Sequence, residues 1–332
     1  MGRGARIGVL GATGALGSEV LAALDASRLR IGEIVAVATE RSLGEDIEFQ
    51  GEVYPVAAER PALKGLDLVF ACAPPAPSLE WIREALRAEV PCIDCSGALL
   101  ASGEVPLRVA ALPPLPEAEG QPAVATPSGA ALAWSLVLAP LQRAAGLRRV
   151  SGTVMESASA GGRDGVTALS AETLALFNQQ ESNVPAAFGR PLAFDCHPSL
   201  EPPEEDGHAP REQDLGRSVQ RLLDAEFGVA ATFVQIPTFL GQASVLSVET
   251  EEPLDPKEAE DFLAQAPGID LWRLGGEGPN LRAAAGRDVV VVGRTRRDPS
   301  SPRGLLLWLA ADPLRLSAAN AVALAVARLQ PH

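Results

Sequence analysis

Apolar and amphipathic stretches alternate along the first third of the chain. The short apolar runs are ARIGVLG, EIVAVAT, LDLVFACA and PCIDCSG, and the helical patterns EVLAALDAS and LEWIREALRAE lie between them. Strands that alternate with helices predict a parallel sheet with helices packed on its faces. Residues 130–145 form a long apolar segment, which predicts a buried helix.

The pattern changes after residue 145. Three segments with β-branched or alternating apolar residues predict a mostly antiparallel sheet: RRVSGTVMESASA, ATFVQIPTFLGQASVLSVETEE and DVVVVGRTRRDPSSPRGLLLWLAAD. The helical patterns TALSAETLALFNQQ and REQDLGRSVQRLLDAEFG lie between them, and SAANAVALAVARLQ closes the chain. The loop 198–210 is rich in Pro, Glu and Asp and predicts an exposed connection. The expected fold class is α/β, with a Rossmann-like parallel sheet followed by an α+β region.

Length and charge limit the function classes. The chain has 332 residues, enough for two domains, and a formal net charge of −14. That charge disfavours a nucleic acid or an anionic membrane as partner. The longest apolar runs, 289–292 and 305–311, are far too short to span a membrane, and the N-terminal residues carry no secretion signal. We therefore expect a cytoplasmic protein.

The cysteines give no sign of a disulfide framework. There are four, Cys72, Cys92, Cys95 and Cys196, with irregular spacing. Cys92 and Cys95 form a C-x-x-C pattern, but neither the helix start of a redox motif nor a second ligand pair for zinc accompanies it. We interpret the cysteines as small buried side chains and expect no metal site.

A glycine-rich turn between the first strand and the first helix predicts a dinucleotide site. It reads GATGALG, a G-x-x-G-x-x-G pattern whose glycines permit a tight turn and a close approach to a pyrophosphate. The alternative is that these glycines only pack the helix on the strand. The expected cofactor-binding residues of this turn are Gly11, Thr13, Gly14, Ala15, Leu16 and Gly17.

The end of the second strand indicates which dinucleotide is bound. An acid there suits the ribose hydroxyls of NAD, whereas an arginine with hydroxyls suits the 2′-phosphate of NADP. The chain places Thr39, Arg41 and Ser42 at this point. We expect NADP, with NAD as the lesser alternative. The alternative is that Arg41 is a solvated side chain in a turn and binds no cofactor.

Seven stretches together resemble the aspartate-semialdehyde dehydrogenase family in order and spacing. They are GATGALG, TERSLG, IDCSGALL with GEVPL, VATPSGA, SASAGG, IPTFLGQ, and VGRTRRD with the closing AANAVALA helix. The resemblance implies a Rossmann domain over 1–129 and 312–332. It also implies an inserted α+β domain over 130–311, whose sheet forms a homodimer interface.

In that family a cysteine thiolate attacks an aldehyde, hydride passes to NADP, and phosphate resolves the thioester. The resemblance places Gly129 at the nucleophile, Gln242 at the catalytic base and Gln235 at a substrate-binding arginine. Further departures fall at Leu100, Glu156, Asp214, Ser218 and Pro313. The pattern resembles the Usg-type branch, in which we expect no catalytic residue to remain. Ser159 and Gly161 of SASAGG stand where the family supplies donors near the nicotinamide.

Three alternatives stay open. Cys72 or Cys95, at strand ends of the first domain, could serve as a relocated nucleophile for an active NADP-dependent aldehyde oxidoreductase in amino-acid biosynthesis. Ser128 or Tyr54 could donate a proton in hydride transfer without a covalent step. A protein without catalysis could instead be a cofactor-responsive dimer, or dock an unidentified protein partner through loop 198–210.

Overall fold

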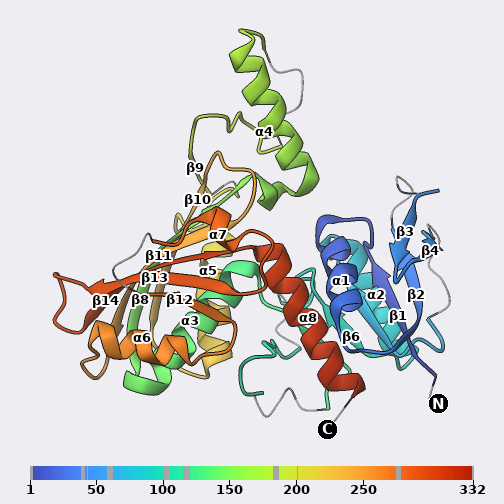
Figure 1. Cartoon of the computed structure of the whole chain (residues 1–332), viewed down its shortest axis with the longest axis horizontal. Coiled ribbons are helices and arrows are strands. Elements are labelled where there is room, and N and C mark those ends of the chain that lie inside the picture. The colour runs from blue at the N-terminus through green and yellow to red at the C-terminus, as the bar shows by residue number, and fades with distance from the viewer. Residues whose placement is uncertain are drawn as a thin grey trace. The chain divides into compact units, whose positions relative to one another are not determined.

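The structure, a computed structural model, describes residues 3–38, 42, 44–57, 63–100, 105–114, 118, 120–181, 187–199, 201–273 and 278–330. The chain forms two compact units (Figure 1). The first unit consists of Met1–Ser128 and Leu314–His332, and the second of Gly129–Pro313. The second unit is therefore an insertion in the chain of the first.

The first unit contains a five-stranded sheet in the order β2-β1-β5-β6-β7, with every neighbouring pair parallel. Its strands are β1 (Ala5–Leu10), β2 (Ile31–Val37), β5 (Leu68–Ala71), β6 (Cys92–Asp94) and β7 (Ala123–Ala125). The chain runs from β1 outward to β2, then crosses to β5 on the other side of β1. Ligands bind beyond the carboxyl ends of the strands at such a switch point. The parallel, Rossmann-like sheet expected from the sequence is confirmed.

Helices cover both faces of this sheet. α1 (Ala15–Ala26) and α8 (Pro313–Leu329) contribute Val20 and Ala321 to one apolar cluster with Val9 of β1. α2 (Pro75–Arg87) buries Trp81 against the opposite face, together with Val69 of β5. Successive side chains of a strand point to opposite faces of the sheet and therefore belong to two separate apolar clusters.

A small hairpin in the first unit was not expected as a separate sheet. β3 (Asp46–Phe49) and β4 (Glu52–Pro55) pair in antiparallel fashion outside the main sheet. Gln50 and Gly51 connect them with φ angles of 52° and 76°. Positive φ at both central residues is the requirement of the tight turn that matches strand twist. Tyr54 lies on β4 of this hairpin.

The second unit contains a seven-stranded sheet in the order β12-β13-β14-β11-β8-β10-β9. Four neighbouring pairs are antiparallel, whereas β8 with β10 and β12 with β13 are parallel. The expected mostly antiparallel sheet is thus confirmed, with two parallel pairs within it. The strands are β8 (Leu147–Glu156), β9 (His197–Pro198), β10 (Gly228–Gln235), β11 (Gln242–Thr250), β12 (Ile269–Trp272), β13 (Val290–Arg297) and β14 (Gly304–Ala311).

One face of this sheet packs against α3 (Gly129–Ala145), α5 (Pro210–Leu223) and α6 (Pro256–Ala264). α3 is buried along most of its length, and its Trp134 indole N–H donates to Ser244 of β11 at 3.0 Å. The long apolar segment of the sequence is therefore the central helix of this unit. On the opposite face, α7 (Leu281–Ala284) covers Val291 and Ala310, while Val245 is 37% exposed.

The remaining helix of the second unit, α4 (Gly162–Phe177), follows the short 3-10 helix η3 (Ala158–Gly161) and extends away from the sheet (Figure 1). Glu172, in the C-terminal half of α4, accepts hydrogen bonds from the N–H groups of Leu192 and Ala193 at 2.7 and 3.0 Å. Among the helices of the described residues, none is long and apolar enough to cross a membrane.

Candidate functional site

The glycine-rich turn follows β1 at the switch point of the first sheet. Gly11 has a φ angle of 78°, and a side chain there would come within 2.7 Å of the backbone nitrogen of Ala73. A side chain on Gly17 would meet the carbonyl oxygen of Gly11 at 2.0 Å. Both positions therefore require glycine, because the turn lies directly against the chain that leaves β5 and against α1.

The start of α1 offers backbone donors to an anion. Gly14 is the N-cap and supplies no side-chain hydrogen bond, and the first turn of the helix contains no acidic residue. N–H groups at a helix start have no partner within the helix, and the helix dipole favours negative charge there. Ala15 and Leu16 occupy this first turn. The geometry fits the pyrophosphate of a dinucleotide, alongside the packing role that Gly11 and Gly17 also have.

The turn also reaches the segment expected to bind the ribose. The hydroxyls of Thr13 and Ser42 lie 2.9 Å apart, so two of the expected cofactor residues meet. Thr39 and Arg41 lie outside the described residues. The hydroxyl pair joins the glycine-rich turn to the chain beyond β2, where a dinucleotide extends in a Rossmann domain.

Three positions singled out by the family resemblance lie side by side in the second unit. Glu156 at the end of β8 pairs in register with Gln235 of β10 on one side and Gln242 of β11 on the other. Gln235 and Gln242 are 2% and 4% exposed. The side-chain amide of Gln235 donates to the carbonyl oxygens of Glu156 and Ser157, at 2.9 and 2.6 Å. Gln235 thus holds the end of β8 in place.

Arg211, which was not singled out from the sequence, also contacts these three positions through Glu156. Arg211 lies in the first turn of α5, and its guanidinium bonds Glu156 and, at 3.0 Å, Glu201. It also stacks over the ring of Phe233, 5.1 Å from its centroid. Glu156, one of the departures from the family pattern, therefore has a guanidinium directly on its carboxylate.

Burial raises the pKa of the Glu156 carboxyl above its ordinary value of 4.5, and Arg211 opposes that rise. A carboxyl with a raised pKa in the folded protein favours folding most at low pH, and this contribution is lost as the pH rises through its folded pKa. The non-titrating Glu156→Gln variant should therefore gain stability relative to the wild type as the pH rises above about 4.5. Urea unfolding across a pH series measures this difference.

The matched control is Glu201→Gln. Glu201 binds the same guanidinium, but its side chain is 38% exposed and remains solvated by water. We expect this variant to change the unfolding free energy by less than about 1 kcal/mol, because the pair it removes is exposed. Equal pH profiles for the two variants would mean that the burial of Glu156 is not the cause.

The position of the family nucleophile, Gly129, is the first residue of α3. A Cβ atom there would lie 2.5 Å from the Cβ of Pro313 and 3.2 Å from its Cα. Two carbon atoms that are not bonded to each other cannot lie 2.5 Å apart, so a side chain at position 129 requires a shift of Pro313 or of its own backbone. Two of the departures found in the sequence, Gly129 and Pro313, are therefore packed against each other within the second unit.

The SASAGG segment is largely engaged in its own unit. The backbone N–H groups of Ala158 and Ser159 donate to the carbonyls of Thr238 and Phe239. The Ser159 hydroxyl lies 2.9 Å from that of Ser157, and a side chain on Gly161 would meet the ring of Phe188 at 2.9 Å. The expected role of Ser159 toward a nicotinamide would therefore use its hydroxyl, since its N–H is already bonded.

Tyr54 and two of the histidines, the side chains that could transfer a proton, bond to groups near them in the chain. Tyr54 donates its hydroxyl to Glu52 at 3.1 Å, and burial together with that carboxylate raises the pKa of the Tyr54 phenol. His197 bonds the Pro191 carbonyl at 2.7 Å, and His208 faces Glu212 at the start of α5. Within the described part of the chain, no group of three His, Cys, Asp or Glu side chains is arranged to hold a metal ion.

Asp94 was not singled out from the sequence, yet it organises the loop that carries Cys95. Its fully buried carboxylate accepts hydrogen bonds from the N–H and hydroxyl of Ser96 at 2.8 and 2.5 Å, and from the N–H of Leu99 at 2.8 Å. The Asp-x-Ser spacing in IDCSG is the local signal of such a turn.

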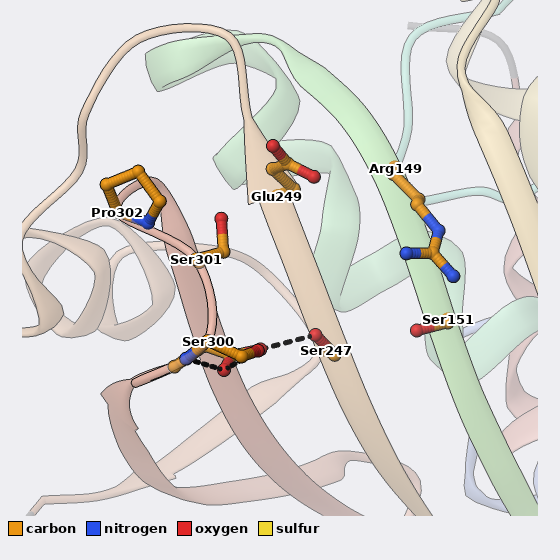
Figure 2. Close-up of a pocket in the computed structure, with 9 residues that line it drawn as sticks. Arg149, Ser151, Ser247, Glu249, Ser300, Ser301 and Pro302 are labelled. Atoms are coloured by element: carbon orange, nitrogen blue, oxygen red, sulfur yellow. Dashed lines mark hydrogen bonds between the residues drawn. The ribbon is translucent and has the colours of Figure 1, made fainter.

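A surface pocket of about 340 Å³ lies on the opposite face of the second sheet, away from these residues (Figure 2). Arg149, Ser151, Ser247 and Glu249 line it from β8 and β11, and the turn between β13 and β14 closes it. In that turn Asp298 accepts hydrogen bonds from Ser300 and Ser247, which lower the pKa of its carboxyl. None of the site residues expected from the sequence lines this pocket.

Comparisons with known proteins agree with this architecture. Residues 6–119 match the model of the semialdehyde dehydrogenase NAD-binding domain, and residues 138–316 match that of the semialdehyde dehydrogenase dimerisation domain. The chain is 32% identical to an aspartate-semialdehyde dehydrogenase of Aquifex aeolicus, with 97% of each chain aligned. It is 31% identical to a USG-1 protein homolog of Azotobacter vinelandii, with 96% of each aligned.

A solved structure extends the likeness to three dimensions. The crystal structure of aspartate semialdehyde dehydrogenase II from Vibrio cholerae superposes with a TM-score of 0.94 over 100% of both chains, at 28% sequence identity. The NAD-binding model covers the glycine-rich turn, and the dimerisation model covers the sheet that carries Glu156, Gln235 and Gln242. With both domains and nearly the full length matched, this protein belongs to the semialdehyde dehydrogenase family.

Proposed function

We propose that this protein is an NADP-binding homodimer related to aspartate-semialdehyde dehydrogenases that does not catalyse the phosphate-dependent thioester reaction. The observation that carries the proposal is the contact between Gly129 and Pro313. Thioester chemistry needs a sulfur nucleophile, and the family resemblance places it at position 129, the first residue of α3. At this position the chain has glycine, and Pro313 occupies the space that a side chain would enter.

The neighbouring positions support the same conclusion. A general base must exchange a proton near neutral pH, and the side-chain amide of Gln242 does not titrate there. Gln235 uses its amide to bind two backbone carbonyls, so this side chain serves the strand end. Arg211 is shared between two carboxylates, Glu156 and Glu201. The local charge therefore does not favour a phosphate or a dicarboxylate-like substrate.

Dinucleotide binding rests on different residues. The Gly11 turn and the first turn of α1 would hold the pyrophosphate through backbone N–H groups. A bound nicotinamide would supply a hydride acceptor or donor. Thr13 and Ser42 would hold the adenosine side of the molecule through their hydroxyls, and Arg41 would bind the 2′-phosphate that distinguishes NADP from NAD.

Calorimetric titration with NADP and NAD, for the wild type and Arg41→Ala, tests this assignment. We expect the variant to lose about 1.5 to 3 kcal/mol of NADP affinity and little NAD affinity, because one charged bidentate contact disappears. Equal losses for the two dinucleotides would contradict the role of Arg41. No binding of either by the wild type would contradict the cofactor proposal.

The second candidate function is an active NADP-dependent aldehyde oxidoreductase in amino-acid biosynthesis. Full-length similarity to proteins named aspartate-semialdehyde dehydrogenase favours it. The test mixes the protein with aspartate semialdehyde, NADP and phosphate and follows NADPH absorbance. We expect no turnover. Turnover that disappears in Cys72→Ser or Cys95→Ser would establish this alternative with a relocated nucleophile.

The homodimer would form through the face of the second sheet that carries Val245. The match to a dimerisation domain and the exposure of this valine on a central strand support that surface. Val245→Lys should shift the protein from dimer to monomer in sedimentation velocity, because a charge would have to be buried at the interface. The matched control is Val53→Lys, on the hairpin of the first unit, where the valine is 66% exposed. This variant should remain dimeric.

A further inference from the structure

Two cysteines meet at the carboxyl edge of the first sheet. Cys72 directly follows β5 and Cys95 directly follows β6, and these strands pair in parallel with Ala71 opposite Asp94. The next residues along each strand, Cys72 and Cys95, are therefore opposite each other. The N–H of Cys95 donates to the Ala71 carbonyl at 3.0 Å, which keeps the two strand ends together.

The two side chains point to the same side of the sheet. Both pack against the apolar cluster that contains Val9 and Val20, and both are half-buried. The neighbouring Cys95 side chain, together with burial, raises the pKa of the Cys72 thiol well above its ordinary value. The Cys95 thiol in turn faces the Ile93 carbonyl, 3.9 Å away. The sulfurs are thus already neighbours in the reduced protein.

The backbone spacing suits a covalent bond between them. Neighbouring strands lie roughly 4.8 Å apart, and a disulfide requires a Cα separation of about 4.4 to 6.8 Å. Opposed residues of adjacent strands therefore fall within the Cα range of a disulfide, and side chains on one face can turn their sulfurs toward each other.

The other two cysteines are differently placed. Cys92 is 1% exposed in the cluster on the opposite face of the sheet, and burial raises the pKa of its thiol to about 12. It therefore cannot pair with Cys95, despite the C-x-x-C spacing. Cys196 is exposed and lies in the second unit.

We propose that Cys72 and Cys95 form a redox-active dithiol that closes to an intrachain disulfide by exchange with a small disulfide such as glutathione disulfide. The Cys95 thiolate attacks one sulfur of glutathione disulfide, forming a mixed disulfide and releasing one glutathione. Cys72 then loses its proton and attacks the Cys95 sulfur, releasing the second glutathione. The protein loses two hydrogens and two electrons, and one glutathione disulfide becomes two glutathione molecules.

The position of this pair gives the reaction a consequence. The chain between Cys72 and Ala73 lies against Gly11, so the dithiol borders the glycine-rich turn at the switch point of the sheet. A disulfide would tie the carboxyl ends of β5 and β6 together beside the dinucleotide position. The exchange chemistry itself does not depend on whether a dinucleotide binds, so the two proposals can fail separately.

The experiment incubates the reduced full-length protein in glutathione buffers of increasing oxidised fraction, quenches free thiols by alkylation and maps peptides by mass spectrometry. We expect a peptide pair joined through Cys72 and Cys95, reversed by dithiothreitol, while Cys92 stays alkylated and Cys196 carries single glutathione. In Cys72→Ser the exchange should stop at the mixed disulfide, so Cys95 should carry glutathione.

Peptide mapping of the wild-type protein tests the proposal even if a serine variant fails to fold. Glutathione on Cys196 shows that the oxidant was effective. With Cys196 modified, both Cys72 and Cys95 remaining alkylated would overturn the proposal. So would stable glutathione adducts on either of them without a crosslink, or a link between Cys92 and Cys95.

Discussion

Gly129→Cys should destabilise the protein by about 1 to 3 kcal/mol and should not create aldehyde dehydrogenase activity. The new side chain would begin 2.5 Å from the Cβ of Pro313, which sits in the first turn of α8 and has little freedom to withdraw. A thiol placed there by force would also lack a titrating base, since position 242 is glutamine. Urea unfolding and an NADPH assay with phosphate measure the two effects.

Ser128→Cys is the matched control for this substitution. Ser128 is the preceding residue and is exposed, so a cysteine there should change the unfolding free energy only slightly. The double variant Gly129→Cys with Pro313→Gly should be more stable than the sum of the single changes predicts, because the glycine removes the clashing Cβ. Additive losses would show that the contact between 129 and 313 is not what excludes a side chain.

Gly11→Ala is expected to abolish dinucleotide binding and to lower the unfolding free energy by about 2 kcal/mol or more. Alanine at a φ angle of 78° is strained, and its methyl group would lie 2.7 Å from the backbone of Ala73. The turn would have to open, which moves the N–H groups at the start of α1. Calorimetric titration with NADP and urea unfolding test this together.

Gly14→Ala is the matched control, because Gly14 belongs to the same glycine pattern but does not have a positive φ angle. Gly14 has a φ angle of −72°, and the nearest atom to an added Cβ is the Gly11 carbonyl oxygen at 3.1 Å. Its loss of stability should be about 1 kcal/mol or less. If Gly11→Ala and Gly14→Ala behaved alike, the close approach to Ala73 would not be the reason for glycine at 11.

The features that could be predicted from the sequence have local causes. The glycines of GATGALG are required by backbone a few residues away and by the end of one neighbouring strand. Their pattern is therefore visible in a short stretch of sequence. The same holds for the buried helix α3, whose apolar residues are continuous. The row of Glu156, Gln235 and Gln242 could be anticipated because the family resemblance assigns a role to each position.

The features that could not be predicted depend on pairing between distant segments. Arg211 reaches Glu156 across 55 residues, after a loop whose composition suggested only an exposed connection. Cys95 was visible with Cys92 as a C-x-x-C pattern, but alternation along a strand sends those two side chains to opposite faces. Its actual neighbour, Cys72, follows from the order of strands in the sheet, which no local periodicity specifies.

The contact between Gly129 and Pro313 also bears on how such a chain could have been assembled. These are the first and last residues of the second unit, and they touch. A segment whose ends meet can be inserted into another protein at a single peptide bond without stretching its host. The Rossmann unit, for its part, needs only a short bridge from Ser128 to Leu314 to be continuous. The same geometry that leaves no room for a nucleophile thus makes each unit separable, as expected of a domain once acquired as a single piece.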